Sequence, residues 1–409
     1  MNILIINHYA GSPTLGREFR SYYLAKEWVK LGHKVVIIAA DFSHLRLLQP
    51  VVDSDFQLDE IDGIVYVWIK TTKYTSSGFK RVLNMFNFIS KLLIHYKRIS
   101  TIANPEIVIA SSTYPLDIYP AYILARKNRA KLVFELHDLW PLSPMVIGNY
   151  SKYHPFIWLM QRAENFACRN CDCFISLLGN ADKYLIQHGL KENKFFHIPN
   201  GYSVDNLESI EKKISAEHEE LFKKIKTASR IVIGYVGGHS PSNALKSLVA
   251  ASGKVSDNDN IAFVLVGDGS CKNELIEMAK VKNQKNIYFL PQVPKSLIPT
   301  ILRQFDILYA GGVRSILHSY GTSFNKIIDY MLAEKPIIFA VDEPNSLIEK
   351  VGCGIRIQAE NEIELVKTIE FFSGLSIEVR TAMGKKGREY ALRELNYTYL
   401  AKKFIDAII

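Results

Sequence analysis

At 409 residues the chain is too long for one ordinary hydrophobic core, and its length predicts two domains of roughly 150–200 residues each. Its composition, 48% hydrophobic and 22% charged, is ordinary for a soluble globular protein, and no apolar run reaches the ~18 residues that span a bilayer. The formal charge of +9 points to an anionic partner, which could be phosphate groups, a membrane surface or nucleic acid.

The first residues have the character of a buried strand. Met1–Asn7 lacks the basic start of a signal peptide and is mostly aliphatic. We therefore expect the protein to stay in the cytoplasm.

The first half alternates predicted strands and helices. Arg17–Leu31 is predicted to be a helix that buries Phe19, Tyr22, Ala25 and Val29 and ends at Gly32. Alternation of this kind is typical of a parallel, doubly wound α/β sheet. The predicted strands are Ile3–Asn7, Lys34–Ala40, Ile64–Ile69, Ile107–Ala110, Lys131–Glu135 and Cys173–Ser176.

The segment from Lys70 to Arg98 is basic and apolar and contains no acidic residue. This composition favours an amphipathic helix on an anionic membrane, and the alternative is a core helix with a basic outer face. The side chains predicted to meet the membrane are Lys80, Arg81, Phe86 and Lys91. Nucleic-acid binding is not favoured, because no motif of that class is present.

Three cysteines lie close together at Cys168, Cys171 and Cys173. A zinc site would need a second pair of Cys or His ligands at similar spacing, and none is visible. The alternative, reduced structural thiols in a helix end and the following strand, suits a cytoplasmic protein. We expect no metal and no cofactor.

A charged, partly helical linker is predicted at residues 205–230, after Ile198–Gly201, and the strand–helix pattern then resumes. The domains are thus predicted at 1–204 and 231–388, with a final helix at 389–409 that packs back on the first domain. Most strands of the second half end in glycine or proline, at the sheet edge where ligands bind. These strands are Ile231–Tyr235, Ile261–Val266, Ile287–Leu290, Ile307–Ala310 and Pro336–Ala340.

A helix predicted to open at Thr322 or Ser323 is the strongest functional signal. Its spacing places Ser323, Lys326 and Asp329 on one face, where a helix N-terminus and a lysine suit a diphosphate and a carboxylate suits a ribose diol. The alternative is an N-capped surface helix with an ordinary charged face. Arg314 and His318 lie in a glycine-containing loop just upstream, which is either a second source of positive charge or a solvated loop.

Two features of the first half also bear on function. His137 and Asp138 follow a predicted strand, where they could orient a substrate hydroxyl or phosphate or serve a purely structural role. Gly11 and Ser12 lie in a turn that enters a helix and could meet an anion. Neither this turn nor Gly267–Gly269 has the full glycine spacing of a dinucleotide site.

Taken together, these motifs resemble those of retaining glycosyltransferases of family 4, and more narrowly the WbuB-type sugar transferases of bacterial O-antigen and capsule assembly. The segments that carry the resemblance are Ser323–Met331 with Lys335 and Pro336, Gly267–Gly269, His137–Pro141, Gly11 and Ile198–Gly201. The resemblance implies the GT-B fold, with two Rossmann-like doubly wound domains facing a central cleft. It implies a UDP-sugar donor, and one candidate for the donor sugar is an N-acetylated hexosamine. It also implies a lipid-linked or polysaccharide acceptor at the inner face of the plasma membrane.

The resemblance also implies roles for individual residues. His137, Lys326 and Arg314 would be catalytic, with His137 beside the transferred sugar. Asp329 would hold the ribose, and Gln292 with Val293 would meet the base. The donor-binding set would be Gly11, Ser12, Gly237, Gly238, His239, Gly267, Gln292, Val293, Ser323, Asn325, Lys326 and Asp329.

The chain departs from the family pattern at two places. Gly321 stands where the first of two acids, eight positions apart, would be, and the loop 237–243 lacks the usual arginine and lysine. Two other functions therefore remain open: a UDP-sugar 2-epimerase of the same architecture, and a non-catalytic glycosyltransferase-like subunit.

Overall fold

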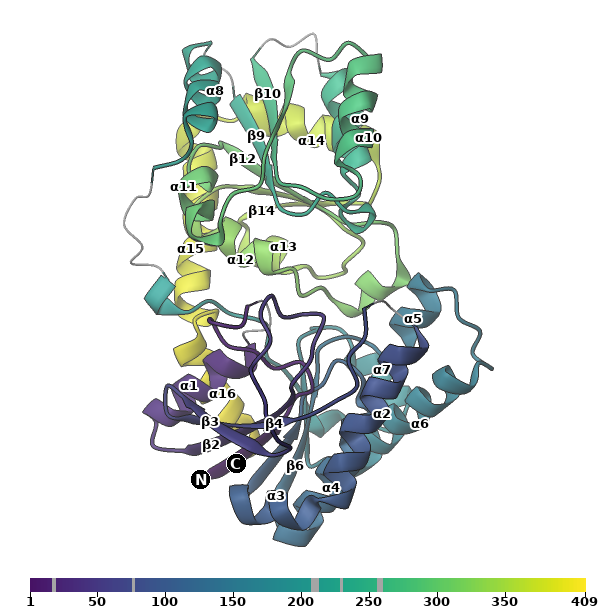
Figure 1. Ribbon diagram of the computed structural model, residues 1–409. Coiled ribbons are helices and arrows are strands. Elements are labelled where there is room, and N and C mark those ends of the chain that lie inside the picture. The colour runs from purple at the N-terminus through teal and green to yellow at the C-terminus, as the bar shows by residue number, and fades with distance from the viewer. Residues whose placement is uncertain (17–19, 76–77, 207–212, 229–230, 256–259) are drawn as a thin grey trace. The chain divides into compact units, whose positions relative to one another are not determined.

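The computed structural model describes residues 1–16, 20–75, 78–206, 213–228, 231–255 and 260–409. These residues form two compact units (Figure 1). The N-terminal unit comprises Met1–Ser203 and Tyr397–Ile409, and the C-terminal unit comprises Val204–Asn396. Each unit is a Rossmann-like α/β sandwich, which confirms the predicted fold class.

Among the described residues, the sheet of the N-terminal unit has eight strands in the order β3-β4-β2-β1-β5-β6-β7-β8, all parallel except β3. Their bounds are β1 Asn2–Ile6, β2 Lys34–Ala40, β3 Gln57–Ile61, β4 Ile64–Ile69, β5 Ile107–Ala110, β6 Lys131–Leu136, β7 Cys173–Ser176 and β8 Phe195–His197. The central strands are aliphatic and buried, as expected when helices cover both faces.

Helices cover both faces of this sheet (Figure 1). Their bounds are α1 Arg20–Lys30, α2 Phe79–Ile94, α3 Tyr96–Ala103, α4 Ile118–Asn128, α5 Leu142–Ile147, α6 Pro155–Asn170, α7 Asp182–Gln187 and α16 Tyr397–Ile408. On one face α1 packs against α16, and the main core of the unit lies between this pair and the sheet. On the other face α4 packs between α2 and α6.

The C-terminal unit has, within its described residues, a sheet of six parallel strands in the order β11-β10-β9-β12-β13-β14. These are β9 Ile231–Val236, β10 Ile261–Val266, β11 Ile287–Leu290, β12 Ile307–Gly311, β13 Ile337–Ala340 and β14 Gly354–Ile357. The helices are α8 Ala216–Thr227, α9 Leu245–Lys254, α10 Lys272–Val281, α11 Ile298–Leu302, α12 Asn325–Leu332, α13 Leu347–Val351, α14 Glu362–Gly374 and α15 Ile377–Glu394. The core lies between the sheet and a layer that includes α9 and α14.

Every predicted strand is present to within one residue at each end, whereas β3, β8 and β14 were not predicted. These three are short or polar strands at sheet edges, so they lack the aliphatic runs that marked the others. The predicted helix Arg17–Leu31 is described from Arg20, since residues 17–19 lie outside the described part. Gly32 follows it with a φ of +84°.

Two predicted segments, the partly helical linker and the final helix, can be compared with the structure. Much of the expected linker 205–230 is α8, which buries Phe222 against Phe305 of the C-terminal unit; residues 207–212 and 229–230 of that prediction lie outside the described chain. The helix predicted at 389–409 is two helices, because α15 ends at Glu394 and α16 begins at Tyr397. The backbone N–H of Tyr397 donates to the carbonyl of Tyr202, which ties α16 to the N-terminal unit.

Within the described residues, no helix is both long and apolar enough to cross a membrane, and no cluster of three or more His, Cys, Asp or Glu side chains could hold a metal ion. Cys168, Cys171 and Cys173 are buried thiols. Burial raises the pKa of Cys171 and of Cys173 to about 12, so both are protonated at neutral pH.

Candidate functional site

The strand order of the C-terminal unit reverses direction between β9 and β12, and Lys326 lies at that point. Ligands of doubly wound sheets bind at the carboxyl edge where the order reverses. Lys326 Nζ donates to Asn243 Oδ1 at 2.6 Å and to the Tyr235 hydroxyl at 3.1 Å. Tyr235 belongs to β9 and Asn243 to the loop that follows it. The helix α12 therefore places the Lys326 ammonium group at the carboxyl edge of β9.

The Lys326 ammonium group is poorly solvated. It lies 4.7 Å from the centroid of the Tyr235 ring, and no carboxylate forms an ion pair with it among the described residues. Burial lowers the pKa of Lys326 to about 8. A half-buried cation held by two neutral oxygens is well suited to bind an anion, because the anion supplies the negative charge that the neighbouring side chains lack.

Two glycine turns beside Lys326 bring backbone against backbone. Gly267 has a φ of +152°, and a Cβ atom there would lie 1.9 Å from the Gly237 carbonyl oxygen. Gly269 meets the backbone of His239 in the same way, at 2.6 Å. The structure thus brings together the predicted residues Gly237, His239, Gly267 and Lys326, and Gly238 accepts hydrogen bonds from both side chains that hold Lys326.

His239 is not a free surface group. Its ring is fully buried near Tyr235 and Phe289, and neither ring nitrogen has a hydrogen-bond partner among the described residues. Burial, assisted by the positive charge of Lys272, lowers the pKa of His239 to about 4. The imidazole is therefore neutral at pH 7.

Asp329 lies one turn beyond Lys326 on α12. It is partly buried, and burial raises its pKa to about 6, a shift that Lys295 opposes. The carboxylate is ionised at neutral pH and lies where the sequence placed it, on the same helix as Lys326.

The start of α12 differs from the prediction. The helix begins at Asn325 with Phe324 as its N-cap, so Ser323 precedes the helix and does not cap it. Thr322, directly before Ser323, donates from its N–H and hydroxyl group to Glu343 at 3.2 and 2.7 Å. Gly321, which replaces the expected acid, has a φ of +106°, a conformation that strains any other residue.

The remaining predicted residues of this unit lie apart from Lys326 in the contacts that can be described. Arg314 is exposed, approaches Asp342 at 3.9 Å and donates to the Ala359 carbonyl. Gln292 and Val293 follow β11, at the carboxyl edge two strands away from β9. Their predicted roles stay predictions.

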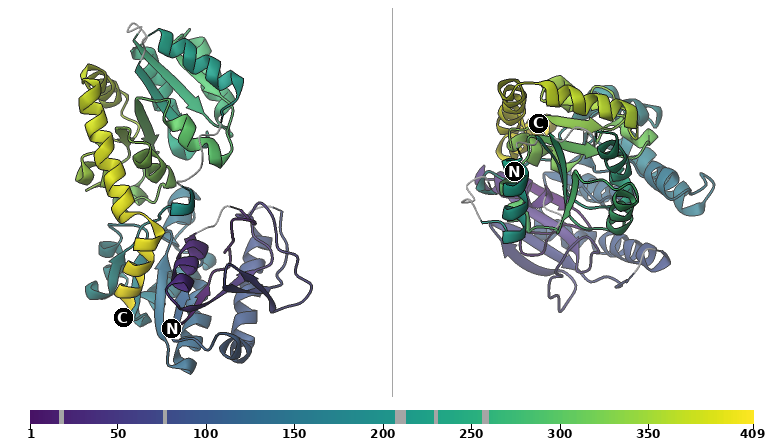
Figure 2. Two further views of the ribbon diagram at one scale, coloured as in Figure 1. Left: turned by 90° about the vertical axis from the view of Figure 1, so that its left-hand side faces the viewer. Right: turned by 90° about the horizontal axis from the view of Figure 1, so that it is seen from above.

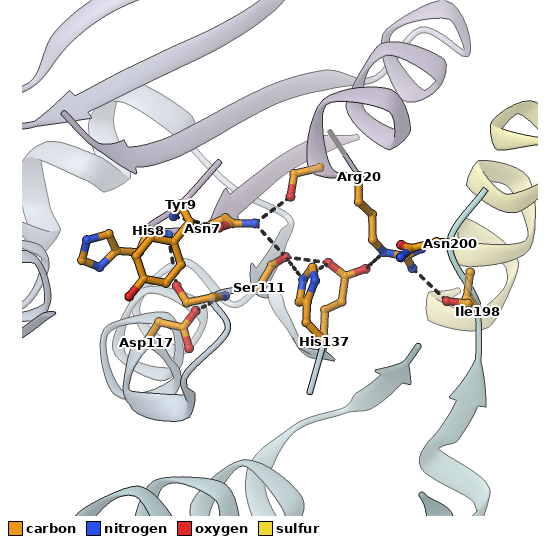
Figure 3. A network of polar contacts seen from close by, with 12 residues as sticks. Asn7, His8, Tyr9, Arg20, Ser111, Asp117, His137, Ile198 and Asn200 are labelled. Carbon is orange, nitrogen blue, oxygen red and sulfur yellow. Dashed lines mark hydrogen bonds and ion pairs between the residues drawn. The ribbon is translucent and has the colours of Figure 1, made fainter. Parts of the chain in front are cut away.

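In the N-terminal unit the strand order reverses between β1 and β5, and a buried polar network lies there (Figure 3). Asn7, directly after β1, donates to Ser111, directly after β5, at 3.5 Å. His137 Nε2 lies 3.0 Å from the Ser111 hydroxyl and 3.4 Å from Glu135 Oε2. Two neighbouring strand ends therefore fix the position of the His137 ring.

Glu135 is the charged centre of this network. Its Oε1 accepts from Arg20 Nε at 2.9 Å, and both side chains are almost fully buried. Burial alone would raise the pKa of Glu135, but Arg20, His137 and Ser111 together hold it well below its usual range. Arg20 also donates to the carbonyls of Ile198 and Pro199. Glu135 therefore remains ionised and orients His137.

Asp138, the residue after His137, accepts from the Leu139 N–H and the Ser143 hydroxyl, at the start of α5. The role predicted for His137 and Asp138 in orienting a substrate stays a prediction. Glu135, which contacts His137, was missed by the sequence analysis. The signal for Glu135 was its place at the end of a strand, two positions before His137 on the same side of the chain.

The predicted loop residues Gly11 and Ser12 are both buried. The Gly11 carbonyl accepts from the Tyr66 hydroxyl, and the Ser12 hydroxyl pairs with Thr14. These contacts pack the loop onto its own unit.

The four predicted membrane residues on α2 do not share one direction. Lys80 and Phe86 are exposed. Lys91 forms an ion pair with Asp55 at 2.6 Å. Arg81 has a buried Nε atom. Burial of His44 and, as a smaller cause, the positive charge of Arg81 lower the pKa of His44 to about 4. Membrane contact by these four side chains stays a prediction, and Lys91 also serves a contact within the unit.

With this geometry in place, comparison with known proteins defines the class. The protein-family model described as "Glycosyltransferase Family 4" matches residues 16–206 of the sequence. A second family model, described as "Glycosyl transferases group 1", matches residues 230–372. The protein is therefore an enzyme of the glycosyltransferase class. More particularly, it is a GT-B glycosyltransferase built from a family 4 domain followed by a group 1 domain.

Solved structures share the fold over nearly the whole chain. HepE of Anabaena in complex with UDP is 15% identical, with 99% of both chains covered and a TM-score of 0.68. A trehalose-6-phosphate protein structure from E. coli, bound with UDP-2-fluoro glucose, is 10% identical, covers 99% of this chain and 98% of the other, and has a TM-score of 0.72. WaaG, involved in lipopolysaccharide biosynthesis, is 13% identical, with 99% of both chains covered and a TM-score of 0.64. A comparison with curated protein sequences found no match.

Proposed function

We propose that the protein transfers a sugar from a UDP-linked donor, with retention of configuration, to a lipid-linked or polysaccharide acceptor. The products would be cell-surface polysaccharides such as O-antigen, capsule or lipopolysaccharide. The observation that carries the donor assignment is Lys326, a poorly solvated cation at the carboxyl edge of β9. UDP and UDP-sugars in the solved structures of the same fold support the choice of nucleotide.

In the proposed reaction the C-terminal unit binds the donor. Lys326 offsets the charge of the diphosphate as it leaves, and Asp329 accepts hydrogen bonds from the ribose. The glycine turns at 237–238 and 267–269 let the backbone approach the phosphates. Because the lysine supplies the positive charge, we propose that transfer needs no metal ion and no cofactor.

The N-terminal unit would receive the acceptor. Glu135 holds His137 at the end of β6, and we propose that His137 contacts the transferred sugar. A lipid-linked acceptor requires the protein to work at the inner face of the plasma membrane. N-acetylated hexosamines are the first donor class to test.

The nucleotide assignment is tested by thermal unfolding with UDP, ADP and GDP at equal concentrations. Since a ligand present at 100 times its dissociation constant stabilises the folded state by about 2.7 kcal/mol, UDP should raise the melting temperature well above either purine nucleotide. Equal shifts from all three nucleotides would contradict the proposal.

Incubation with UDP-N-acetylglucosamine and no acceptor separates transfer from epimerisation. We expect slow release of UDP by hydrolysis and no new UDP-sugar. Formation of a second UDP-sugar would identify an epimerase, and tight UDP binding without turnover on any donor and acceptor pair would identify a non-catalytic subunit.

A further inference from the structure

The hairpin made by α5, the following loop and α6 exposes large apolar side chains. Figures 1 and 2 show this loop extending from the edge of the N-terminal unit. The side chains of Ile147 and Tyr153 are 77% and 81% exposed, and those of Val146, Tyr150 and Trp158 are 40%, 47% and 55% exposed. We call these five residues the hairpin surface. Single exposed apolar residues need no explanation, but a cluster within one short segment marks an interaction surface.

The charge of this segment has one sign. Between Asp138 and Glu164 the sequence contains Lys152 and Arg162 and no acidic residue. Lys152 Nζ lies 5.1 Å from the Tyr153 ring, and the Arg162 guanidinium lies 4.6 Å from the Trp158 ring. The flanking acids do not offset these cations, because Glu164 is buried and Asp138 is hydrogen-bonded to Ser143.

We propose that the hairpin surface inserts into the headgroup region of an anionic lipid bilayer. Tyrosine and tryptophan are the side chains enriched at membrane–water interfaces, where one end of the ring is apolar and the other is wet. Ile147 and Val146 add aliphatic surface that can enter the acyl boundary, and Lys152 and Arg162 meet lipid phosphates. The absence of acidic residues between Asp138 and Glu164 favours an anionic lipid surface as the occupant.

This surface is separate from the one that the sequence indicated. The outward side of α2 carries the exposed side chains Phe79, Leu83, Phe86 and Ile94. Since α4 packs against both α2 and α6, the two surfaces lie on the same face of the sheet. We infer that α2 assists and that the hairpin surface is the main anchor. This inference rests on the membrane part of the proposed function and is independent of the nucleotide.

The test is partitioning of the purified full chain onto vesicles of phosphatidylcholine with and without phosphatidylglycerol. Ile147→Ser combined with Tyr153→Ser should lower the partition coefficient at least tenfold. A matched exposed pair on the C-terminal unit, Val281→Ser with Ile363→Ser, should leave it unchanged, and Phe79→Ser with Ile94→Ser on α2 should have a smaller effect. All six side chains are exposed, so the variants should fold.

Tryptophan fluorescence supplies a second readout. Trp158 is 55% exposed, Trp140 is only partly exposed, and Trp28 and Trp68 are each 1% exposed, so brominated lipids should quench the emission of Trp158 most strongly. Trp158→Phe should abolish most of that quenching.

Three results would overturn the inference. If the α2 pair abolishes binding while the hairpin pair binds normally, the anchor is α2 and the membrane proposal stands. If the unaltered protein binds neither vesicle, the membrane part of the proposed function fails with it, whereas UDP stabilisation is unaffected. If the hairpin pair turns a dimer into a monomer without vesicles, the surface joins two copies of the chain.

Discussion

At the scale of single residues, Lys326 and Asp329 divide the work of nucleotide binding in a way that can be measured. Lys326 is held against neutral oxygens and so attracts an anion, whereas Asp329 is ionised and offers only acceptors. A diphosphate and a ribose diol need opposite partners. The two side chains should therefore affect different parts of one ligand.

Lys326→Ala should weaken the binding of UDP and of pyrophosphate alike, and it should lower turnover tenfold or more. The loss of one contact to developing charge costs roughly 2–4 kcal/mol. Asp329→Ala should weaken UDP and uridine but leave pyrophosphate binding unchanged. Calorimetric titration of both variants with the three ligands checks this. Equal losses for pyrophosphate in both variants would remove the proposed division.

The lowered pKa of Lys326 predicts proton uptake on donor binding. In the ligand-free protein this pKa is about 8, so near pH 8.5 most molecules have lost the proton. A bound diphosphate favours the charged form and raises the pKa, so binding must take up a proton above pH 8 and almost none below pH 7. Titrations in buffers of different ionisation enthalpy measure this uptake. Lys326→Met should abolish it, and unchanged uptake in that variant would assign the proton to another group.

At the scale of elements, the glycine turns that end β9 and β10 depend on each other. In Gly267→Ala the new Cβ would overlap the Gly237 carbonyl, and the φ of +152° would strain the backbone by about 1–3 kcal/mol. We expect a lower melting temperature and weaker UDP binding. Gly374→Ala, where nothing lies within 4 Å of the new Cβ, is the matched control and should behave as the unaltered protein. Wild-type UDP affinity in Gly267→Ala would show that the turns do not shape the site.

The sequence was sufficient to predict most helices and strands, but it did not predict which side chains contact one another. Runs such as Ile261–Val266 are buried on both faces, so their aliphatic character alone identifies strands and the α/β fold. Lys326 was found because helix spacing is local. Its partners Tyr235 and Asn243 are some 90 positions away, and only the folded sheet brings them together. The ion pair of Lys91 with Asp55 was not predicted, because composition does not reveal which way a half-buried cation points.

At the scale of the whole molecule, the chain returns from the C-terminal unit to complete the N-terminal unit with α16. The α16 side chains Leu400, Phe404 and Ile405 are buried within the N-terminal unit, with Phe404 packed on Trp28. The indole N–H of Trp28 also donates to the Ala401 carbonyl at 3.0 Å. The stability of the N-terminal unit therefore depends on residues beyond the C-terminal unit.

Phe404→Ala should destabilise the N-terminal unit by about 3–5 kcal/mol, because the site would be left with a cavity beside Trp28. The neighbouring exposed Lys403→Ala should have no effect. Calorimetric unfolding should show an earlier transition in Phe404→Ala that UDP does not shift, while a UDP-sensitive transition remains. A single transition displaced as a whole would mean that the two units unfold together.

The position of α16 also sets an order for folding during synthesis. The first 203 residues leave the ribosome early, but the helix that covers their sheet is translated only after the entire C-terminal unit. Many multidomain chains fold from the N-terminus as they are made. Here the face of the first sheet that α1 and α16 share stays only partly covered until α16 is made, and the C-terminal unit can reach its native state before that. A chaperone that recognises exposed apolar strands would therefore bind this nascent chain through its N-terminal unit, and it would be released only after α16 has been made.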